Sequence, residues 1–152
     1  MLIRRVTRDD RDEMLRMRLA LWPDSTADDL EAEMPSWLKD ESRLIVFVAE
    51  REGGGLAGFV EAGIRDVAED CETRDVGYVE GWYVDGDARL RGVGRMLVGA
   101  AEDWARSRGC VEMASDCLLT NEVSLAAHLR LGYEETARLI HFRKRLDNPS
   151  TE

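Results

Sequence analysis

The sequence has no apolar run long enough to span a bilayer, and its start, Met-Leu-Ile-Arg-Arg, lacks the apolar segment of a signal peptide. The cysteines, Cys71, Cys110 and Cys117, are odd in number and lack the spacing of a metal site. Internal repeats and low-complexity linkers are also absent from the sequence. From these absences we expect a cytoplasmic protein with free thiols, no metal and no membrane partner.

Positive charge is scarce relative to negative charge. The 152 residues include 21 Lys and Arg against 31 Asp and Glu, which gives a net charge of −10 at pH 7. An acidic chain of this kind argues against general nucleic-acid binding and favours cationic small molecules or basic peptides as partners. The length allows one domain, and a hydrophobic content of 44% is ordinary for a globular protein.

The stretch at residues 84–97 combines the features of a phosphate-binding loop. It follows an aromatic and β-branched segment typical of a strand, and it leads into apolar residues at helical spacing. The glycines of its Arg-Leu-Arg-Gly-Val-Gly segment let the backbone approach a ligand, and the first N–H groups of a helix have no intrahelical acceptor. Positive charge comes from Arg89, Arg91 and Arg95. The stretch therefore suits a pyrophosphate group.

Other proteins also join a strand to a helix through a glycine-rich turn. Dinucleotide binders need a third glycine, and the sequence contains no Gly-x-x-x-x-Gly-Lys. An ordinary basic helix start with two turn glycines remains an alternative. The spacing Arg-x-x-Gly-x-Gly resembles the acyl-coenzyme A loop of the GNAT superfamily of N-acetyltransferases. The resemblance implies that acetyl-CoA is the cosubstrate and that its pyrophosphate is bound by Arg89, Leu90, Arg91, Gly92, Val93, Gly94 and Arg95.

The remaining elements follow from composition and periodicity. Strands are predicted at residues 2–6, 43–50, 56–65, 77–84, 110–116, 133–137 and 139–144. Helices are predicted from Thr7–Asp10 to Trp22, from Ser25 or Thr26 to about Leu38, from Val93 to about Ser107 and from Asn121 or Thr120 to Leu131. Pro35 is expected to kink or end the second helix.

The resulting order, β-α-α-β-β-β-α-β-α-β-β, predicts an α/β (α+β) mixed sheet with helices on its faces. This is also the order of the GNAT fold, so the resemblance covers nearly the whole chain. It implies a single N-acetyltransferase domain at residues 1–146, followed by a polar, frayed tail at residues 147–152.

The GNAT fold implies a gap in the centre of the sheet. The strand ending at Val84 is expected to splay from the strand starting at Cys110, with a bulge at Gly81. The pantetheine arm of acetyl-CoA then pairs with the backbone of Trp82, Tyr83 and Val84. Asn121 matches a position that commonly contacts coenzyme A, although it also reads as a helix cap.

Two acidic residues are candidates for the proton transfer that amine acetylation requires. The substrate ammonium must lose a proton before it attacks the thioester carbonyl, and a carboxylate can hold it and accept that proton. Glu80 lies in the strand before the phosphate loop, and Asp116 lies at the end of the next predicted strand. From the residues alone, an exposed strand position for Glu80 and a capping role for Asp116 remain open.

Several blocks, in order and spacing, look like the aminoglycoside 6'-N-acetyltransferases of the GNAT superfamily. They are Leu21-Trp-Pro23, Val79-Glu-Gly81, Glu112-Met-Ala-Ser-Asp116, Leu131-Gly-Tyr-Glu-Glu-Thr136 and Arg143-Lys-Arg145. The resemblance implies an enzyme that acetylates the 6'-amine of aminoglycosides by direct attack on the thioester, which confers antibiotic resistance. Trp22, Glu80 and Asp116 would bind the substrate, with Asp116 and Glu80 as candidate bases, and Asp70 of the acidic loop could bind other amino groups. Trp22 also reads as a core residue at a helix end.

The sequence departs from the family at one catalytic position. Many GNAT enzymes carry a tyrosine in the last helix as the acid for the leaving thiolate, and His128 stands there in this chain. His128 either serves as that acid or is a histidine on the helix surface. The family often forms dimers through its C-terminal strands, which implies a homodimer. Acetylation of another amine, such as a polyamine or a protein N-terminus, and a non-catalytic acyl-CoA-binding domain are the alternative functions.

Overall fold

The computed structural model describes residues 1–39 and 43–149. The contacts of the chain divide it into two units, with the boundary between Cys117 and Leu118. The first unit contains the sheet and most of the predicted site, and the second contains the last helix.

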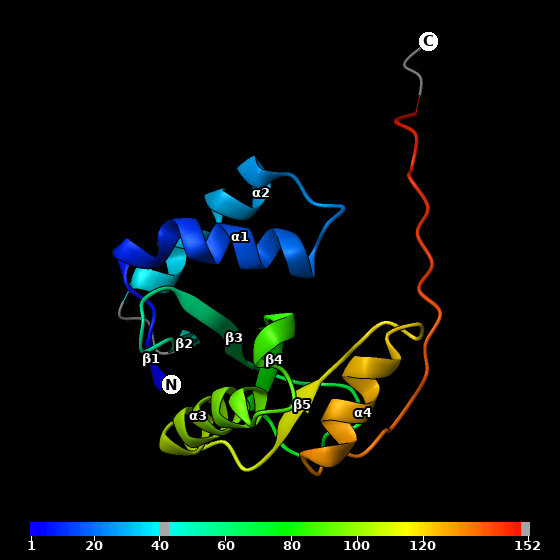
Figure 1. Ribbon diagram of the computed structural model, residues 1–152. Helices are drawn as coiled ribbons and strands as arrows, with labels where there is room; N and C mark the ends of the chain where they lie inside the picture. Colours follow the sequence, from blue (N-terminus) through cyan, green and yellow to red (C-terminus); the bar gives the residue numbers. More distant parts are fainter. Residues whose placement is uncertain (40–42, 150–152) are drawn as a thin grey trace. The chain divides into compact units, whose positions relative to one another are not determined.

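The first unit is built on a mixed sheet. Its strands, in spatial order, are β1 (Leu2–Arg5), β2 (Leu44–Glu50), β3 (Leu56–Arg65), β4 (Val76–Val84) and β5 (Met113–Ser115) (Figure 1). Neighbouring strands are antiparallel except for β4 and β5, which are parallel. This arrangement confirms the predicted α/β fold with a mixed sheet. β5 is shorter than the predicted strand at residues 110–116, because only three of its residues pair with β4.

Helices cover both faces of this sheet. α1 (Arg11–Leu21) packs on one face and α3 (Val93–Ser107) on the other (Figure 1). Under α1, the core contains Met14, Met17, Val46, Val48 and Phe59, and under α3 it contains Val60, Ala62, Val79, Leu97 and Ala101. Alternate residues of β3 therefore point to opposite faces, as the period of two predicts.

Local sequence sets the helix boundaries. Thr7 and Asp10 form a capping box around a short 3-10 turn (η1, Arg8–Asp10) before α1. The predicted second helix is interrupted, which corrects the expectation of one helix to Leu38. It consists of α2 (Ala27–Ala32), where the side chain of Thr26 caps the N–H of Asp29, and a 3-10 segment, η2 (Met34–Leu38). Pro35 lies in the first turn of η2, where its missing N–H costs nothing.

The predicted bulge and gap are both present in the sheet. Glu61 of β3 pairs with Gly81, whereas the next residue, Ala62, pairs with Val79, so Glu80 is the extra residue of a β-bulge. On the other side of β4, pairing with β5 ends at Val79 and Ser115. β4 continues to Val84 beyond the last of these pairs, which confirms that the two central strands separate.

The second unit contains α4 (Glu122–Arg130). Asn121 caps this helix, and its side chain accepts a hydrogen bond of 3.1 Å from the N–H of Ser124. Gly132 ends the helix region with a φ of 89°. Within the two described ranges, no helix is long and apolar enough to cross a membrane.

The two closing strands predicted at residues 133–137 and 139–144 are not formed. Residues 133–149 carry no strand assignment, and the side chains of Ile140 and Phe142 are 77% and 91% exposed. The alternation of apolar residues favours extended backbone, but a strand also needs a partner to satisfy its N–H and C=O groups. Residues 133–149 pair with none of the strands in the described ranges, so the prediction of two strands is wrong.

Candidate active site

The loop before α3 has the backbone geometry of an anion-binding site. Gly92 is the N-cap of α3, with a φ of 81°, and Leu90 also has a positive φ, of 60°. An added Cβ at Gly92 would meet no atom within 4 Å, so the backbone borders open space. Gly94 lies beneath the ring of Trp82, where a Cβ would lie 2.8 Å from a ring carbon. The first N–H groups of a helix have no acceptor within it, and the open space at Gly92 lets a ligand such as pyrophosphate approach this end of α3.

A network of ion pairs holds the start of this loop, which includes η3 (Gly86–Ala88). Asp85 accepts hydrogen bonds from Arg16 of α1 at 2.9 Å and from Arg51 of the β2–β3 turn at 3.2 Å. Arg51 also contacts Asp87 at 2.8 Å. Burial alone would raise the pKa of Asp85, but the hydrogen bonds from Arg16 and Arg51 lower it below its ordinary value. The loop is thus fixed to two other elements before any ligand arrives.

Arg89, one of the predicted cofactor-binding residues, contacts the end of β4. Its Nε donates a hydrogen bond of 2.8 Å to the carbonyl oxygen of Val84, the last residue of β4. Its guanidinium lies 6.0 Å from the ring centroid of Tyr83. Arg89 therefore ties the end of the strand to the loop that follows it.

The two predicted acids lie on one face of the sheet, and each contacts a partner. Glu80, in the bulge, accepts hydrogen bonds of 2.9 and 2.7 Å from Nε and Nη2 of Arg65. Asp116, just after β5, accepts a hydrogen bond from the phenol of Tyr78. The guanidinium of Arg65 stacks on the ring of Tyr78, with Cζ 3.4 Å from the ring centroid. Arg65 and Tyr78 thereby link the two carboxylates.

Tyr78 keeps its proton in this cluster. Burial raises its pKa well above the ordinary value for tyrosine, and the hydrogen bond to Asp116 raises it further. The phenol is therefore a donor at neutral pH, and it orients the carboxylate of Asp116.

Trp22 lies at the end of α1, beside the bulge. An added Cβ at Gly81 would lie 2.7 Å from Cη2 of Trp22, so the ring edge packs directly on the backbone of β4. The guanidinium of Arg18 is 4.8 Å from the ring centroid of Trp22 and 4.6 Å from that of Trp37. Arg18 is only 1% exposed, and it forms ion pairs with Glu61 and Glu33. Trp22 is therefore held by Arg18 and by the backbone of Gly81, the residue after Glu80.

Glu61 is a buried acid that pairs with Arg18. Burial raises its pKa to about 7, although the charge and hydrogen bond of Arg18 oppose the shift. The negative charge of Glu80, in the bulge, also raises the pKa of Glu61.

Asp70 does not join the other predicted substrate residues. It is exposed in the loop between β3 and β4, with a positive φ of 60°. In the part of the chain that the structure describes, no hydrogen bond or ion pair connects it to Trp22, Glu80 or Asp116. The loop is fixed instead by Glu112, whose carboxylate accepts the N–H of Thr73 at 2.6 Å.

His128 lies in the second unit, on α4. Its Nδ1 is 2.7 Å from the carbonyl oxygen of Ser124, and its ring contacts Tyr133 edge-on at 5.7 Å between centroids. A carbonyl oxygen can only accept, so Nδ1 carries the proton. Nε2 is then able to donate a proton only when the ring is the imidazolium.

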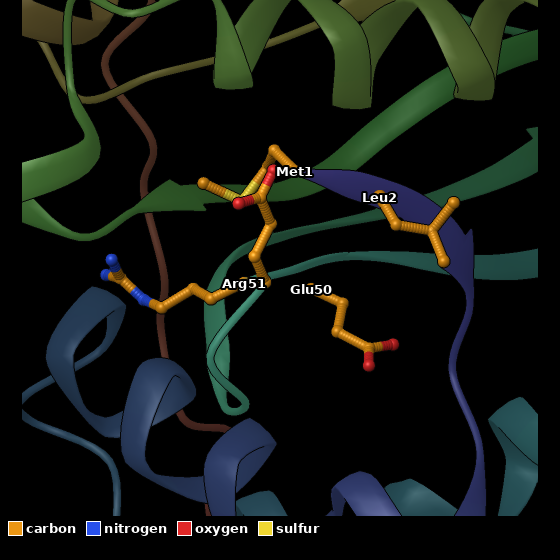
Figure 2. Close-up of a pocket in the computed structure, with 5 residues that line it drawn as sticks. Met1, Leu2, Glu50 and Arg51 are labelled. Carbon is orange, nitrogen blue, oxygen red and sulfur yellow. The ribbon is translucent and has the colours of Figure 1, made fainter.

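A separate hollow lies at the other edge of the sheet. It is lined by Met1, Leu2, Glu50, Arg51 and Glu52 (Figure 2). The side chains of Glu50 and Arg51 point away from each other rather than toward a common ligand (Figure 2). Because β1 and β5 form opposite edges of the sheet, this hollow is not part of the site around the two acids.

The arrangement of a split parallel strand pair, a glycine-rich loop and the helix that follows matches a known family. The model of the acetyltransferase (GNAT) family matches residues 8–133 of the chain. The chain belongs to the GNAT family.

Among GNAT proteins, the relatives point to one group. An aminoglycoside N(6')-acetyltransferase type 1 from Klebsiella aerogenes is 45% identical over 95% of this chain and 97% of its own. Another, from Stenotrophomonas maltophilia, is 40% identical over 95% of this chain and 94% of its own. These relatives confirm the predicted resemblance to aminoglycoside 6'-N-acetyltransferases.

Solved structures agree with this placement in the GNAT family. AAC(6')-Iy in complex with the bisubstrate analogue CoA-S-monomethyl-acetylneamine has a TM-score of 0.88 at 34% identity, over 95% of this chain and 98% of that one. An apo aminoglycoside 6'-N-acetyltransferase, AAC(6')-IG from Acinetobacter haemolyticus, has a TM-score of 0.89 at 33% identity, over 97% of this chain and 100% of that one. Both similarities extend over nearly the whole chain.

Sequence reasoning missed Tyr78 and Arg65. The period of two along β4 places Tyr78 near Glu80, so the strand pattern contained a signal for the tyrosine. Arg65 has no local signal, because its contact with Glu80 depends on how β3 and β4 pair around the bulge.

Proposed function

We propose that this protein transfers the acetyl group of acetyl-CoA to the 6'-amine of an aminoglycoside, which confers resistance to the antibiotic. The observation that carries the proposal is the position of Glu80 and Asp116, two carboxylates linked through Arg65 and Tyr78 where β4 and β5 separate. Relatives named for this activity, at up to 45% identity over 95% of the chain, support it.

The two carboxylates bind the substrate amine and accept its proton. An aminoglycoside is a polycation, and its 6'-amine arrives protonated at neutral pH. Glu80 and Asp116 hold the ammonium, and Asp116 or Glu80 accepts its proton, directly or through a water. Trp22 forms an apolar wall beside them and restricts the orientation of the sugar ring. Asp70 binds another amino group of the substrate.

The phosphate loop holds the cosubstrate. Its open N–H groups at Gly92 and Gly94 and the side chains of Arg89, Arg91 and Arg95 bind the pyrophosphate, with Leu90 and Val93 shaping the loop. Trp82, Tyr83 and Val84 present backbone groups to the pantetheine arm, and Asn121 contacts coenzyme A from the helix it caps. Acetyl-CoA supplies the acetyl group as a thioester, and no covalent intermediate on the protein is needed.

His128 is the candidate proton donor to the leaving thiolate. The hydrogen bond from Nδ1 to the carbonyl oxygen of Ser124 fixes the ring, and Nε2 donates the proton when the ring is the imidazolium. Replacement of His128 by Gln should lower kcat without changing the Kd for acetyl-CoA.

The protein forms a homodimer through its C-terminal segment. Leu139, Ile140 and Phe142 are exposed on backbone without a strand partner, and pairing with a second copy would bury them. Sedimentation should give a dimer for the wild-type protein and a monomer for Phe142→Asp. The protein acts in the cytoplasm, where acetyl-CoA is available; its free cysteines suit a reducing compartment.

The activity is tested by thiol release from acetyl-CoA, with kanamycin and with an analogue that lacks the 6'-amine. Turnover with kanamycin and none with the analogue establishes both the reaction and the position of acetylation. Protein that binds acetyl-CoA but releases no thiol with either compound would overturn the proposal and direct attention to polyamines and peptide N-termini.

A further inference from the structure

We infer that Arg65 is an internal competitor of the substrate, which occupies Glu80 in the free enzyme and must release it when the substrate amine binds. The release costs free energy, so Arg65 lowers the apparent affinity for every amine that uses Glu80. The inference rests on the proposed function, because it takes Glu80 as a binding residue for the substrate ammonium.

The first observation is that Arg65 uses both oxygens of Glu80. Nε donates to Oε1 at 2.9 Å, and Nη2 donates to Oε2 at 2.7 Å. This is the paired geometry in which a guanidinium binds a carboxylate most specifically. A substrate ammonium at Glu80 needs the same oxygens, so the two cations compete.

The second observation is that Arg65 also lies beside the other acid. Its guanidinium stacks on Tyr78, whose phenol donates to Asp116. The hydrogen bond to Glu80 raises the pKa of Arg65, and the charge of Asp116 adds to the shift. The internal cation therefore offsets negative charge at both carboxylates of the candidate site.

The third observation is that Arg65 is able to leave. Its side chain is 41% exposed and that of Glu80 is 34% exposed, so water reaches the pair. Access of solvent makes this pair weaker than a buried ion pair, even with its paired geometry, so a competing cation can replace Arg65. Arg18, at 1% exposure between two tryptophans, is the opposite case and stays in place.

The exchange of cations has a cost for every amine that uses Glu80. An incoming ammonium replaces the positive charge of Arg65 at Glu80, and the released guanidinium remains close enough to repel it. An aminoglycoside brings further ammonium groups, which the same guanidinium also repels. Removal of the charge of Arg65 should therefore raise the affinity for a polycation at least as much as that for a monoamine.

The test compares Arg65→Gln with Arg106→Gln. Arg106 lies in the last turn of α3, pairs with Asp103 and Glu102, and gives the same change in net charge away from the site. The probes are kanamycin and cyclohexylmethylamine, a monoamine with its amine on a ring methylene. Relative to R106Q, R65Q should raise kcat/KM by about fivefold for the monoamine and by at least as much for kanamycin. Arg65→Lys, which keeps the charge but loses the paired geometry, should fall between.

Other outcomes overturn the inference. Equal kcat/KM values for kanamycin in R65Q and R106Q would show that Arg65 does not compete, and lower values with both substrates in R65Q would show that it assists binding. Failure of the proposed function looks different, because the wild-type protein then releases no thiol with kanamycin. In that case calorimetry decides: kanamycin should bind R65Q about fivefold more tightly than R106Q, and equal or absent binding overturns the inference too.

Discussion

Trp22 packs edge-on against Gly81, so closely that a Cβ at Gly81 would lie 2.7 Å from Cη2 of the indole. The contact joins the end of α1 to the bulge of β4, and it sets the position of the aromatic wall beside Glu80.

We predict that Gly81→Ala displaces Trp22. The extra methyl should lower the free energy of unfolding by roughly 1–3 kcal/mol, the usual cost of overpacking. It should also raise the KM for kanamycin, whereas the Kd for acetyl-CoA should stay unchanged. Gly99→Ala is the matched control, because a Cβ there meets nothing within 4 Å in α3, and it should gain about 0.5–1 kcal/mol. Equal KM values for the two variants would mean that Trp22 does not shape the substrate site.

Asp116→Asn tests the proton acceptor. Asparagine can still accept the hydrogen bond from Tyr78, but it cannot take a proton from the amine. We expect kcat to fall by about 10²–10⁴-fold, as for the loss of a general base, with the Kd for acetyl-CoA unchanged. Asp103→Asn, on the exposed end of α3, makes the same change in charge and should be fully active. A D116N enzyme with wild-type kcat would remove Asp116 from the reaction.

Gly92→Ala tests the backbone geometry of the phosphate loop. A φ of 81° strains any residue with a Cβ, so the variant should lose about 1–2 kcal/mol of stability or distort the loop. Either result should weaken acetyl-CoA binding, measured by calorimetry. Gly86→Ala has open space and no positive φ, and it should bind acetyl-CoA like the wild-type protein. Similar Kd values for both variants would contradict a role for the left-handed N-cap.

Asp10→Asn tests the pH dependence of stability. Hydrogen bonds from Arg4, both at 2.8 Å, lower the pKa of Asp10 below its ordinary value of 3.8. A carboxyl with a lowered pKa stabilises the folded state above its unfolded pKa, and the contribution is lost as the pH falls through the folded pKa. The variant should therefore lose about 2 kcal/mol at pH 7, and the difference from wild type should shrink below about pH 3.8. Urea unfolding at a series of pH values measures this, and a constant difference would show that the charge is not the cause.

The phosphate loop was predictable because its determinants are contiguous. A strand, two glycines and an amphipathic helix lie within one short stretch, and the structure places Gly92 at the N-cap of α3 as that pattern requires. The helix at residues 26–38 was harder to predict, because Pro35 allowed either a kink or a new start and the structure has a 3-10 segment. The closing strands at residues 133–144 failed for another reason: the pattern describes an extended chain, and only a partner makes it a strand.

The sequence by itself determined which residue types stand at the ends of the central strands, because alternation and helix signals are local. It therefore nominated Glu80 and Asp116, and the resemblance to the aminoglycoside 6'-N-acetyltransferases added Trp22. The tertiary structure decided what these residues contact: Arg65 reaches Glu80 through strand pairing around the bulge, and Tyr78 reaches Asp116 across a parallel pair. These contacts join residues far apart in the chain, and pairing register and packing, which no local pattern specifies, bring them together.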